Sequence, residues 1–250
     1  MSLSESATPR KANMKYALNL KKTEHLGRDV IQKKFDIVVA GETVPCVMWE
    51  PASGVKLRTL IAMGHGGGQH KTTCSIRNRA LRYARDFGWA SLAIDAPKHG
   101  ARISREEKEV ERLTTQARVN GVANAPSMST QDKITLLNAL AAQAVPEWQA
   151  ALDSVLERFA LDLVSMGYWH LSPGTWIGIP LLAVETRFCC AVLGLSQWHP
   201  DQSAIRDRDY AIALFNAFGS ADKSMHINPG GHGDIPPSEV DSWDGFSNGI

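Results

Sequence analysis

The sequence predicts an α/β fold with a mostly parallel, twisted sheet and helices on both of its faces. Four short apolar runs, at residues 60–63, 89–94, 164–169 and 189–195, are separated by segments with helical periodicity. Strands that are buried on both faces read as such runs, and strands that alternate with helices indicate parallel βαβ units. With 250 residues and 44% hydrophobic content, the chain is long enough to bury a substantial core.

The N-terminal part of the chain predicts a polar tail followed by a hairpin. Residues 1–34 are polar and rich in Lys and Ser, so we expect a loose tail there. The strand-like runs Phe35–Val39 and Val44–Trp49 flank a short segment that contains Gly41. Two such runs separated by a few residues with a glycine predict a β-hairpin.

A strand–helix–strand unit follows the hairpin. Leu60–Met63 is a short apolar run that ends in a glycine-rich loop. In Thr73–Phe87 the apolar residues recur at helical spacing, and Gly88 ends the pattern. Trp89–Ile94 reads as the next buried strand. These elements predict the first parallel unit of the sheet.

Residues 102–145 interrupt this alternation. They hold a charged helix over 104–113, a stretch rich in Gly, Asn, Pro and Ser, and a second helix over 131–142. The sequence therefore predicts a helical cap, inserted into a core that consists of residues 35–101 and 146–250.

The alternation of helices and strands resumes after the insertion. Pro146 stands near the first turn of a predicted helix, a position that proline favours. The predicted elements are, in order, helix 146–161, strand 164–169, helix 174–184, strand 189–195, helix 204–218, strand 224–227 and a short helix over 237–246.

Ser172 stands directly after the strand predicted at 164–169 and before an apolar helix. The pattern G-x-S-x-G at a turn from strand to helix exposes a serine hydroxyl for nucleophilic catalysis. Here His170 replaces the first glycine and Pro173 follows the serine. An ordinary turn is the alternative, because Ser, Gly and Pro are common turn residues. The place of Ser172 between a strand and a helix favours the nucleophile.

The loop Gly64-His65-Gly66-Gly67-Gly68 also lies between a predicted strand and a predicted helix. Glycines let backbone N–H groups approach a ligand without an intervening side chain. An HGGG loop in this position supplies part of an oxyanion hole in esterases. A phosphate-binding turn or a plain flexible loop is the alternative, but the spacing fits neither G-x-G-x-x-G nor a Walker loop.

His232 and Asp201 are the candidate partners of Ser172. His232 lies in a glycine-rich loop just past the last predicted strand, where it could act as a general base, and Asp201 precedes it in the chain. The resulting order Ser…Asp…His is that of the α/β-hydrolases. The alternatives are a surface histidine for His232 and a helix N-cap for Asp201. A metal site formed by His226, His232 and Asp234 lacks a further ligand.

Composition and charge narrow the class of protein. The net charge is +1, and no apolar stretch approaches the roughly 20 residues of a membrane span, so we expect neither a nucleic-acid nor a membrane partner. The N-terminus lacks the pattern of a secretory signal. The four cysteines show no metal-binding spacing, and we expect buried, reduced thiols in a cytoplasmic protein without a metal or cofactor.

Taken together, the motifs resemble the dienelactone hydrolase-like and acetyl-esterase-like branch of the α/β-hydrolase superfamily. The resemblance covers about Leu60 to the C-terminus as an ordered set of stretches: Gly64-His65-Gly66-Gly67-Gly68 with Lys71, Asp95-Ala96-Pro97-Lys98-His99-Gly100 with Arg102, Gly167 to Thr175 around Ser172, Ala191-Val192-Leu193-Gly194-Leu195, Leu214 to Ser220, Lys223, and Asn228-Pro229-Gly230-x-His232.

The resemblance implies an α/β-hydrolase fold and a role for each site residue. Ser172 would be the nucleophile, His232 the general base and Asp201 the acid that orients it. Gly67 and the residue after the serine, Pro173, would line the oxyanion hole.

Three features depart from the family pattern. Pro173 has no N–H, although the residue after the nucleophile normally donates one to the oxyanion. His170 places a large side chain where the crossing of strand and helix usually requires glycine. The segment from Leu195 to Asp201 is very short. Either the sheet is one strand short near the acid turn, or Cys189–Leu195 serves as two strands, and in both cases the position of Asp201 relative to His232 stays open.

We expect a serine hydrolase that cleaves small carboxylic esters through an acyl-enzyme on Ser172. A catalytically impaired binding protein with the same fold is the alternative, because Pro173 and His170 disturb the elbow. A thioesterase or peptidase could use the same triad. The sequence specifies neither the ester nor the oligomeric state.

Overall fold

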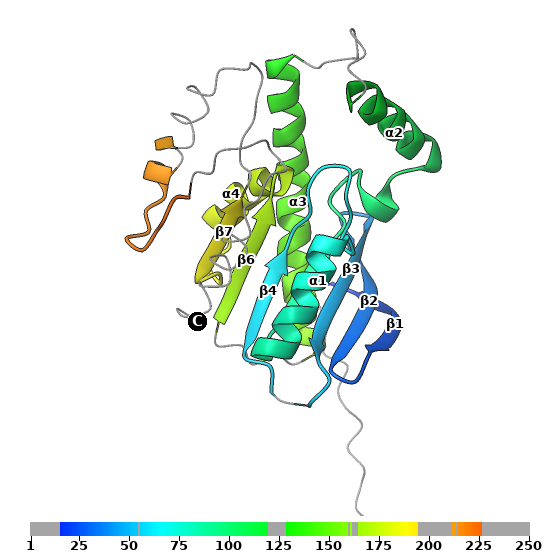
Figure 1. Cartoon of the computed structure of the whole chain (residues 1–250), viewed down its shortest axis with the longest axis vertical. Coiled ribbons are helices and arrows are strands. Elements are labelled where there is room, and N and C mark those ends of the chain that lie inside the picture. Colours follow the sequence, from blue (N-terminus) through cyan, green and yellow to red (C-terminus); the bar gives the residue numbers. More distant parts are fainter. Residues whose placement is uncertain are drawn as a thin grey trace, which may run out of the picture.

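The computed structural model describes residues 16–54, 56–119, 129–159, 161, 165–194, 212–213 and 215–226. Within these residues, seven strands form one mixed sheet in the order β1-β2-β3-β5-β4-β6-β7 (Figure 1). The first three strands are antiparallel, and the other four run parallel to one another. The predicted α/β sheet is confirmed.

The antiparallel part of the sheet contains the predicted hairpin. Strands β2 (Val30–Val39) and β3 (Glu42–Pro51) pair from Val39 opposite Glu42, and Ala40 and Gly41 form the turn with φ angles of 50° and 85°. Two positive φ angles are typical of a type I′ hairpin turn, which matches the twist of the strands.

The prediction of a loose tail over residues 1–34 is wrong for its second half, which forms strands. Strand β1 (Leu18–Leu26) and the start of β2 lie in that range. β1 pairs only with β2 and is mostly exposed, so its residues can be polar and it carries no apolar run. An exposed edge strand of this kind has the composition of a tail.

The parallel part of the sheet positions the site. β4 (Thr59–Met63) lies between β5 (Ala90–Ile94) and β6 (Ser165–Leu171), and β7 (Cys190–Gly194) follows β6. The chain therefore leaves β4 towards β5 on one side and later adds β6 on the other. In open α/β sheets, ligands bind outside the carboxyl ends of the strands at such a switch point.

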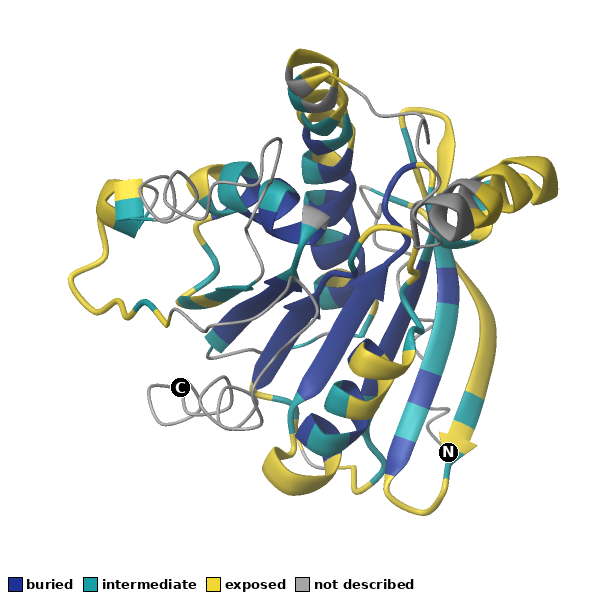
Figure 2. Ribbon diagram, turned by 45° about the horizontal axis from the view of Figure 1, so that its top comes forward, coloured by how far each residue is buried: buried dark blue, intermediate teal, exposed yellow. Residues whose placement is uncertain are grey.

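Helices cover both faces of the sheet (Figures 1 and 2). Helix α1 (Cys74–Arg82) and the π-helical turn η1 (Tyr83–Phe87) pack on one face, and the left-handed Gly88 ends the turn as predicted. Helices α3 (Thr130–Arg158) and α4 (Pro173–Val184) pack on the other face. Each face has its own apolar core, with Trp49 and Trp169 buried beneath α1 and Trp148 and Tyr168 on the α3 side.

The cap region differs from the prediction in one respect. Helix α2 (Arg105–Val119) is present, but residues 131–142 and 146–158 belong to the single helix α3, which continues through Pro146. Its N-terminal half is largely exposed and extends beyond the sheet, whereas the half after Ala141 is largely buried (Figure 2). A proline removes one backbone hydrogen bond, and the packing of the buried half compensates for that loss.

The segment after β7 is described only in part. Residues 212–213 and 215–217 are helical, within the helix predicted at 204–218. Residues 224–226, by contrast, do not form the predicted strand and are mostly exposed. A strand requires a pairing partner, and no described strand lies beside them.

Two further predictions concern the thiols and the membrane. Cys46 is buried as expected, but Cys74 and Cys189 are exposed and free, so the expectation of buried thiols is wrong for these two. The cytoplasmic location stays a prediction. Among the described residues, the structure has no helix with the length and apolar character needed to cross a membrane.

Candidate active site

Ser172 occupies the turn between β6 and α4, at the carboxyl end of a strand beside the switch point. Its backbone has φ 57° and ψ −131°. A positive φ is rare for a residue other than glycine, and such a conformation costs on the order of 1–3 kcal/mol. Conformations of this kind cluster at active sites. The strain is the strongest backbone indication that Ser172 is a functional residue.

Hydrogen bonds from both sides hold the strained turn. The Ser172 N–H donates to the Gly194 carbonyl at the end of β7 (2.9 Å), and the Ser172 carbonyl accepts from the Thr175 N–H (2.8 Å). The Thr175 hydroxyl also donates to the Gly194 carbonyl (2.8 Å). The turn is thereby fixed between two neighbouring strands and its own helix, so the surrounding structure determines the conformation of Ser172.

Pro173 fits the backbone of this turn. It stands at the first position of α4, where its missing N–H removes no intrahelical bond. A residue before proline avoids the helical region, and Ser172 does so. The remaining consequence of Pro173 is chemical: the N–H that the residue after the nucleophile usually donates to an oxyanion does not exist.

His170 is accommodated because two glycines make room for it. A Cβ atom on Gly64 or on Gly174 would overlap the imidazole ring of His170. Gly64 directly follows β4 and Gly174 lies in the first turn of α4, so the ring fills the space between the end of the neighbouring strand and the helix. Where the family pattern has glycine, this chain has His170, and Gly64 and Gly174 leave the space that its ring occupies.

The His170 ring is completely buried among aromatic side chains. The ring centroid of Tyr168 lies 5.1 Å away and that of Trp148 6.5 Å away. Its Nδ1 has no hydrogen-bond partner within the described part of the chain. Burial holds the pKa of His170 well below its usual value, with the nearby His65 acting in the same direction. The ring is therefore a neutral packing element at physiological pH.

The glycine loop lies beside Ser172. A Cβ atom on Gly66 would come within 3.8 Å of the Ser172 Cβ and within 3.3 Å of the Gln69 Oε1. The Gly66 N–H donates to Gln69 Oε1 (3.1 Å), and the Gln69 N–H donates back to the Gly66 carbonyl (3.3 Å). Gly67 and Gly68 form the centre of this turn, with Gly68 at φ 68°.

His65 anchors the base of the same loop. The Ala96 N–H donates to His65 Nε2 (3.0 Å), which places the ring proton on Nδ1, where it is donated to the Gly66 carbonyl (2.9 Å). Burial lowers the pKa of His65 to about 4, against an opposing effect of the Gly66 carbonyl. His65 is thus a neutral structural link between the loops after β4 and β5.

Asp95 ties together the loops that follow β4 and β5. Its carboxylate accepts from the Lys71 N–H (2.9 Å), the Lys71 ammonium (2.6 Å) and the Ala101 N–H (2.9 Å). Burial opposes ionisation of Asp95, but these donors outweigh it and keep the pKa below its usual value. Asp95 therefore has a structural role in these loops.

Arg102 connects the same loops to α3. Its guanidinium makes a bidentate, buried ion pair with Glu147 (2.6 and 2.8 Å), and it donates to the Asp95 carbonyl (3.3 Å). The floor of the site is therefore fixed by ion pairs that come from the β4 loop, the β5 loop and the long helix.

The structure places the glycine loop beside Ser172 and Pro173, and the catalytic roles of these residues stay predictions. Asp201 and His232 lie outside the described residues, so their positions stay predictions. His226 is exposed, and no group of His, Cys, Asp and Glu in the described ranges is suited to hold a metal ion.

Sequence reasoning missed Gln69 and the fit of His170 between two glycines. Gln69 could have been noticed, because it stands three residues after Gly66, the spacing of a turn that closes on itself. The contact of His170 with Gly64 joins residues that are distant in the sequence, and no local pattern indicates it.

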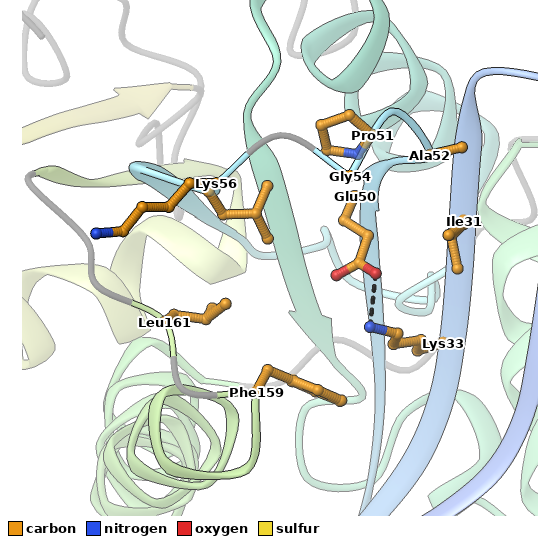
Figure 3. A pocket seen from close by; sticks show the side chains of 10 residues that line it. Ile31, Lys33, Glu50, Pro51, Ala52, Gly54, Lys56, Phe159 and Leu161 are labelled. Atoms are coloured by element: carbon orange, nitrogen blue, oxygen red, sulfur yellow. Dashed lines mark ion pairs between the residues drawn. The ribbon is translucent and has the colours of Figure 1, made fainter.

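A pocket of about 350 Å³ lies elsewhere, at the amino ends of the parallel strands (Figure 3). Lys33 and Glu50 on its wall pair with each other (2.5 Å), and the Lys33 ammonium lies 4.2 Å from the ring centroid of Phe159. Its charged groups are thus already partnered, and the opposite edge of the sheet carries Ser172. We assign no part of the chemistry to this pocket.

Comparison with known proteins gives matches among solved structures alone. No protein-family model and no curated protein matches the chain. A cold-adapted esterase from an Arctic intertidal metagenomic library, in its PEG-bound structure, is 26% identical, with a TM-score of 0.67 over 91% of this chain and 97% of that one. Its native structure matches at 23% identity and a TM-score of 0.63, over 92% and 98% of the two chains.

A more distant match agrees on the fold. A putative acetyl xylan esterase from Bacteroides fragilis is 14% identical, with a TM-score of 0.52 over 70% of this chain and 47% of that one. The TM-scores above 0.5 show that this chain and these neighbours share a fold. The chain therefore has an α/β-hydrolase fold, and its neighbours among solved structures are esterases.

Proposed function

We propose that the protein is a serine hydrolase that cleaves small carboxylic esters. The observation that carries the proposal is the strained Ser172 at the carboxyl end of β6, beside the glycine loop. The similarity of nearly the whole chain to an esterase supports the same class of reaction.

In the proposed reaction, the Ser172 hydroxyl attacks the carbonyl carbon of the ester while His232 takes its proton. Asp201 orients the imidazole and stabilises its cation. The tetrahedral intermediate carries its negative charge on the former carbonyl oxygen, next to the Gly67 loop. His232 then gives the proton to the leaving alcohol, and water, deprotonated by the same histidine, releases the acid from Ser172. The helices of residues 102–145 would shape the pocket and exclude water as a cap.

A catalytically impaired binding protein is the second candidate, because Pro173 offers no N–H to the oxyanion. The loss of one such donor lowers turnover by on the order of 10²–10³. A chain with this defect could retain the fold and a ligand pocket without useful activity. A thioesterase or peptidase would use the same serine but act on a different acyl bond.

Turnover of p-nitrophenyl acetate and butyrate tests the proposal. We expect hydrolysis by the wild-type protein, loss of activity in Ser172→Ala, and covalent labelling of Ser172 by a fluorophosphonate. Asn19→Ala removes an exposed carboxamide from β1, at the far edge of the sheet, and serves as the control. Equal rates in wild type and Ser172→Ala, without a label on Ser172, would favour the binding protein.

A further inference from the structure

Two observations leave the oxyanion site short of donors. Pro173 has no N–H, and the N–H of Gly66 is already donated to the Gln69 side chain. Of the two glycines at the centre of the turn, Gly67 is the one that the proposed function assigns to the oxyanion site. One N–H is fewer than the pair of backbone donors that an α/β-hydrolase elbow normally presents.

The carboxamide of Gln69 lies on the same side of Gly66 as Ser172. Gln69 Oε1 and Cδ, together with the Ser172 Cβ, are the atoms nearest to the open side of Gly66, all within 4 Å of the same point. Gln69 and Ser172 therefore flank one small space above the loop. The side chain of Gln69 is exposed, so its amide can meet a bound substrate.

The hydrogen bond to Gly66 determines which end of the carboxamide is available. A backbone N–H can only donate, so the atom that faces Gly66 is the oxygen of Gln69, and the NH₂ group is turned away from it. No described residue accepts a hydrogen bond from that NH₂ group. An amide that accepts at its oxygen becomes a better donor at its nitrogen, because hydrogen bonds in a chain polarise one another.

We propose that the Gln69 side-chain NH₂ is the second oxyanion donor of this site and replaces the N–H that Pro173 lacks. The inference rests on the proposed function, since it needs a tetrahedral intermediate on Ser172. The Gly66 N–H acts through Gln69: it orients the carboxamide and strengthens its donor. The Gly67 N–H and the Gln69 NH₂ group then bind the developing oxyanion from two sides.

Two substitutions separate donation from loop closure. Gln69→Ala removes both the donor and the acceptor for Gly66. Gln69→Glu keeps an oxygen for the Gly66 N–H, and with it the closed turn, but has no side-chain donor. We expect both variants to lose kcat by on the order of 10²–10³ with little change in KM, because the interaction is made in the transition state. Asn19→Ala again serves as the control, and melting temperatures check the fold.

A double-mutant cycle with Pro173→Ala supplies the decisive readout. This change restores a backbone N–H beside Ser172, and we expect it to raise kcat at least tenfold. In the Pro173→Ala background, Gln69→Ala should cost less than tenfold, because the restored N–H takes over the donor role.

Each other outcome overturns the inference. Full activity in Gln69→Glu would mean that Gln69 only closes the turn, and an equal loss in both backgrounds would mean that it acts through the loop. A gain in Gln69→Ala would mean that the side chain blocks the Gly66 N–H. Wild-type protein whose Ser172 neither turns over ester nor takes the fluorophosphonate label would refute the proposed function as well, which distinguishes the two failures.

Discussion

At the scale of single residues, the site depends on a large side chain that packs between two residues without side chains. His170 replaces a glycine, and Gly64 and Gly174 provide the volume that its ring fills. The ring is neutral because burial disfavours its charged form. It follows that the bulky residue in the elbow is part of the packing that holds the loop after β4 against the start of α4.

Gly64→Ala tests this complementarity. We expect a loss of about 4 kcal/mol or more in the free energy of unfolding, because a methyl group cannot share the space of the His170 ring and both lie in the core. Adding His170→Ala should recover part of that loss, as the ring and the methyl group no longer compete. Denaturant unfolding measures both.

Gly219→Ala is the matched control, because nothing lies within 4 Å of its added Cβ. We expect a change within about 0.5 kcal/mol there. A Gly64→Ala protein as stable as wild type would contradict the account of His170.

At the scale of elements, the site is held by links between loops and helices. Arg102 follows β5 and Glu147 lies on α3, and both side chains are buried. Gln143, one turn earlier on α3, donates to the same carboxylate (3.1 Å). The long helix is thereby fixed to the loop that also carries Asp95.

Arg102→Ala leaves Glu147 buried without its cation. We expect a loss of about 3–5 kcal/mol in the free energy of unfolding, since an uncompensated buried charge is strongly unfavourable. The double variant Arg102→Met with Glu147→Met should be much closer to wild type, because it removes both charges and keeps the volume. If chemical denaturation gives the single and double variants equal stability, the pair does not hold these elements together.

At the scale of the whole molecule, two buried neutral histidines make the fold sensitive to acid. The pKa of His65 is lowered to about 4 and that of His170 is lowered well below its usual value, both mainly by burial. In the unfolded chain both titrate near pH 6.5. Between these values the unfolded state binds protons that the folded state does not.

As far as these two histidines are concerned, the free energy of unfolding therefore has its full value above about pH 6.5 and falls as the pH drops towards 4. Each proton taken up on unfolding contributes a slope of about 1.4 kcal/mol per pH unit. Urea unfolding at pH 7.5, 5.5 and 4.5 measures the slope, and His65→Gln should reduce it by about one proton. A stability that stays constant across this range is the result that would contradict the prediction.

The parts of the fold that could be predicted are those with local signals. The turn around Ser172 and the glycine loop were recognised because their residues are neighbours in sequence. The sequence does not predict the edge strand β1, because an exposed strand can be polar. It also does not predict that α3 is continuous, because proline is frequent at the start of helices and Pro146 lies inside this one.

What could not be predicted depends on contacts across the fold. From the sequence, His170 looks too large for the elbow. The space for its ring is left by Gly64, which follows the neighbouring strand and is distant in the sequence. The role of Asp201 and His232 stays a prediction, since both lie outside the described residues.

The fit of His170 between Gly64 and Gly174 also constrains how this elbow could change over generations. With histidine at position 170, a side chain at either glycine would overlap the imidazole ring. Histidine therefore fits at position 170 of this fold where positions 64 and 174 hold glycine. The three positions are coupled by volume, so a change at one of them limits what the other two can hold.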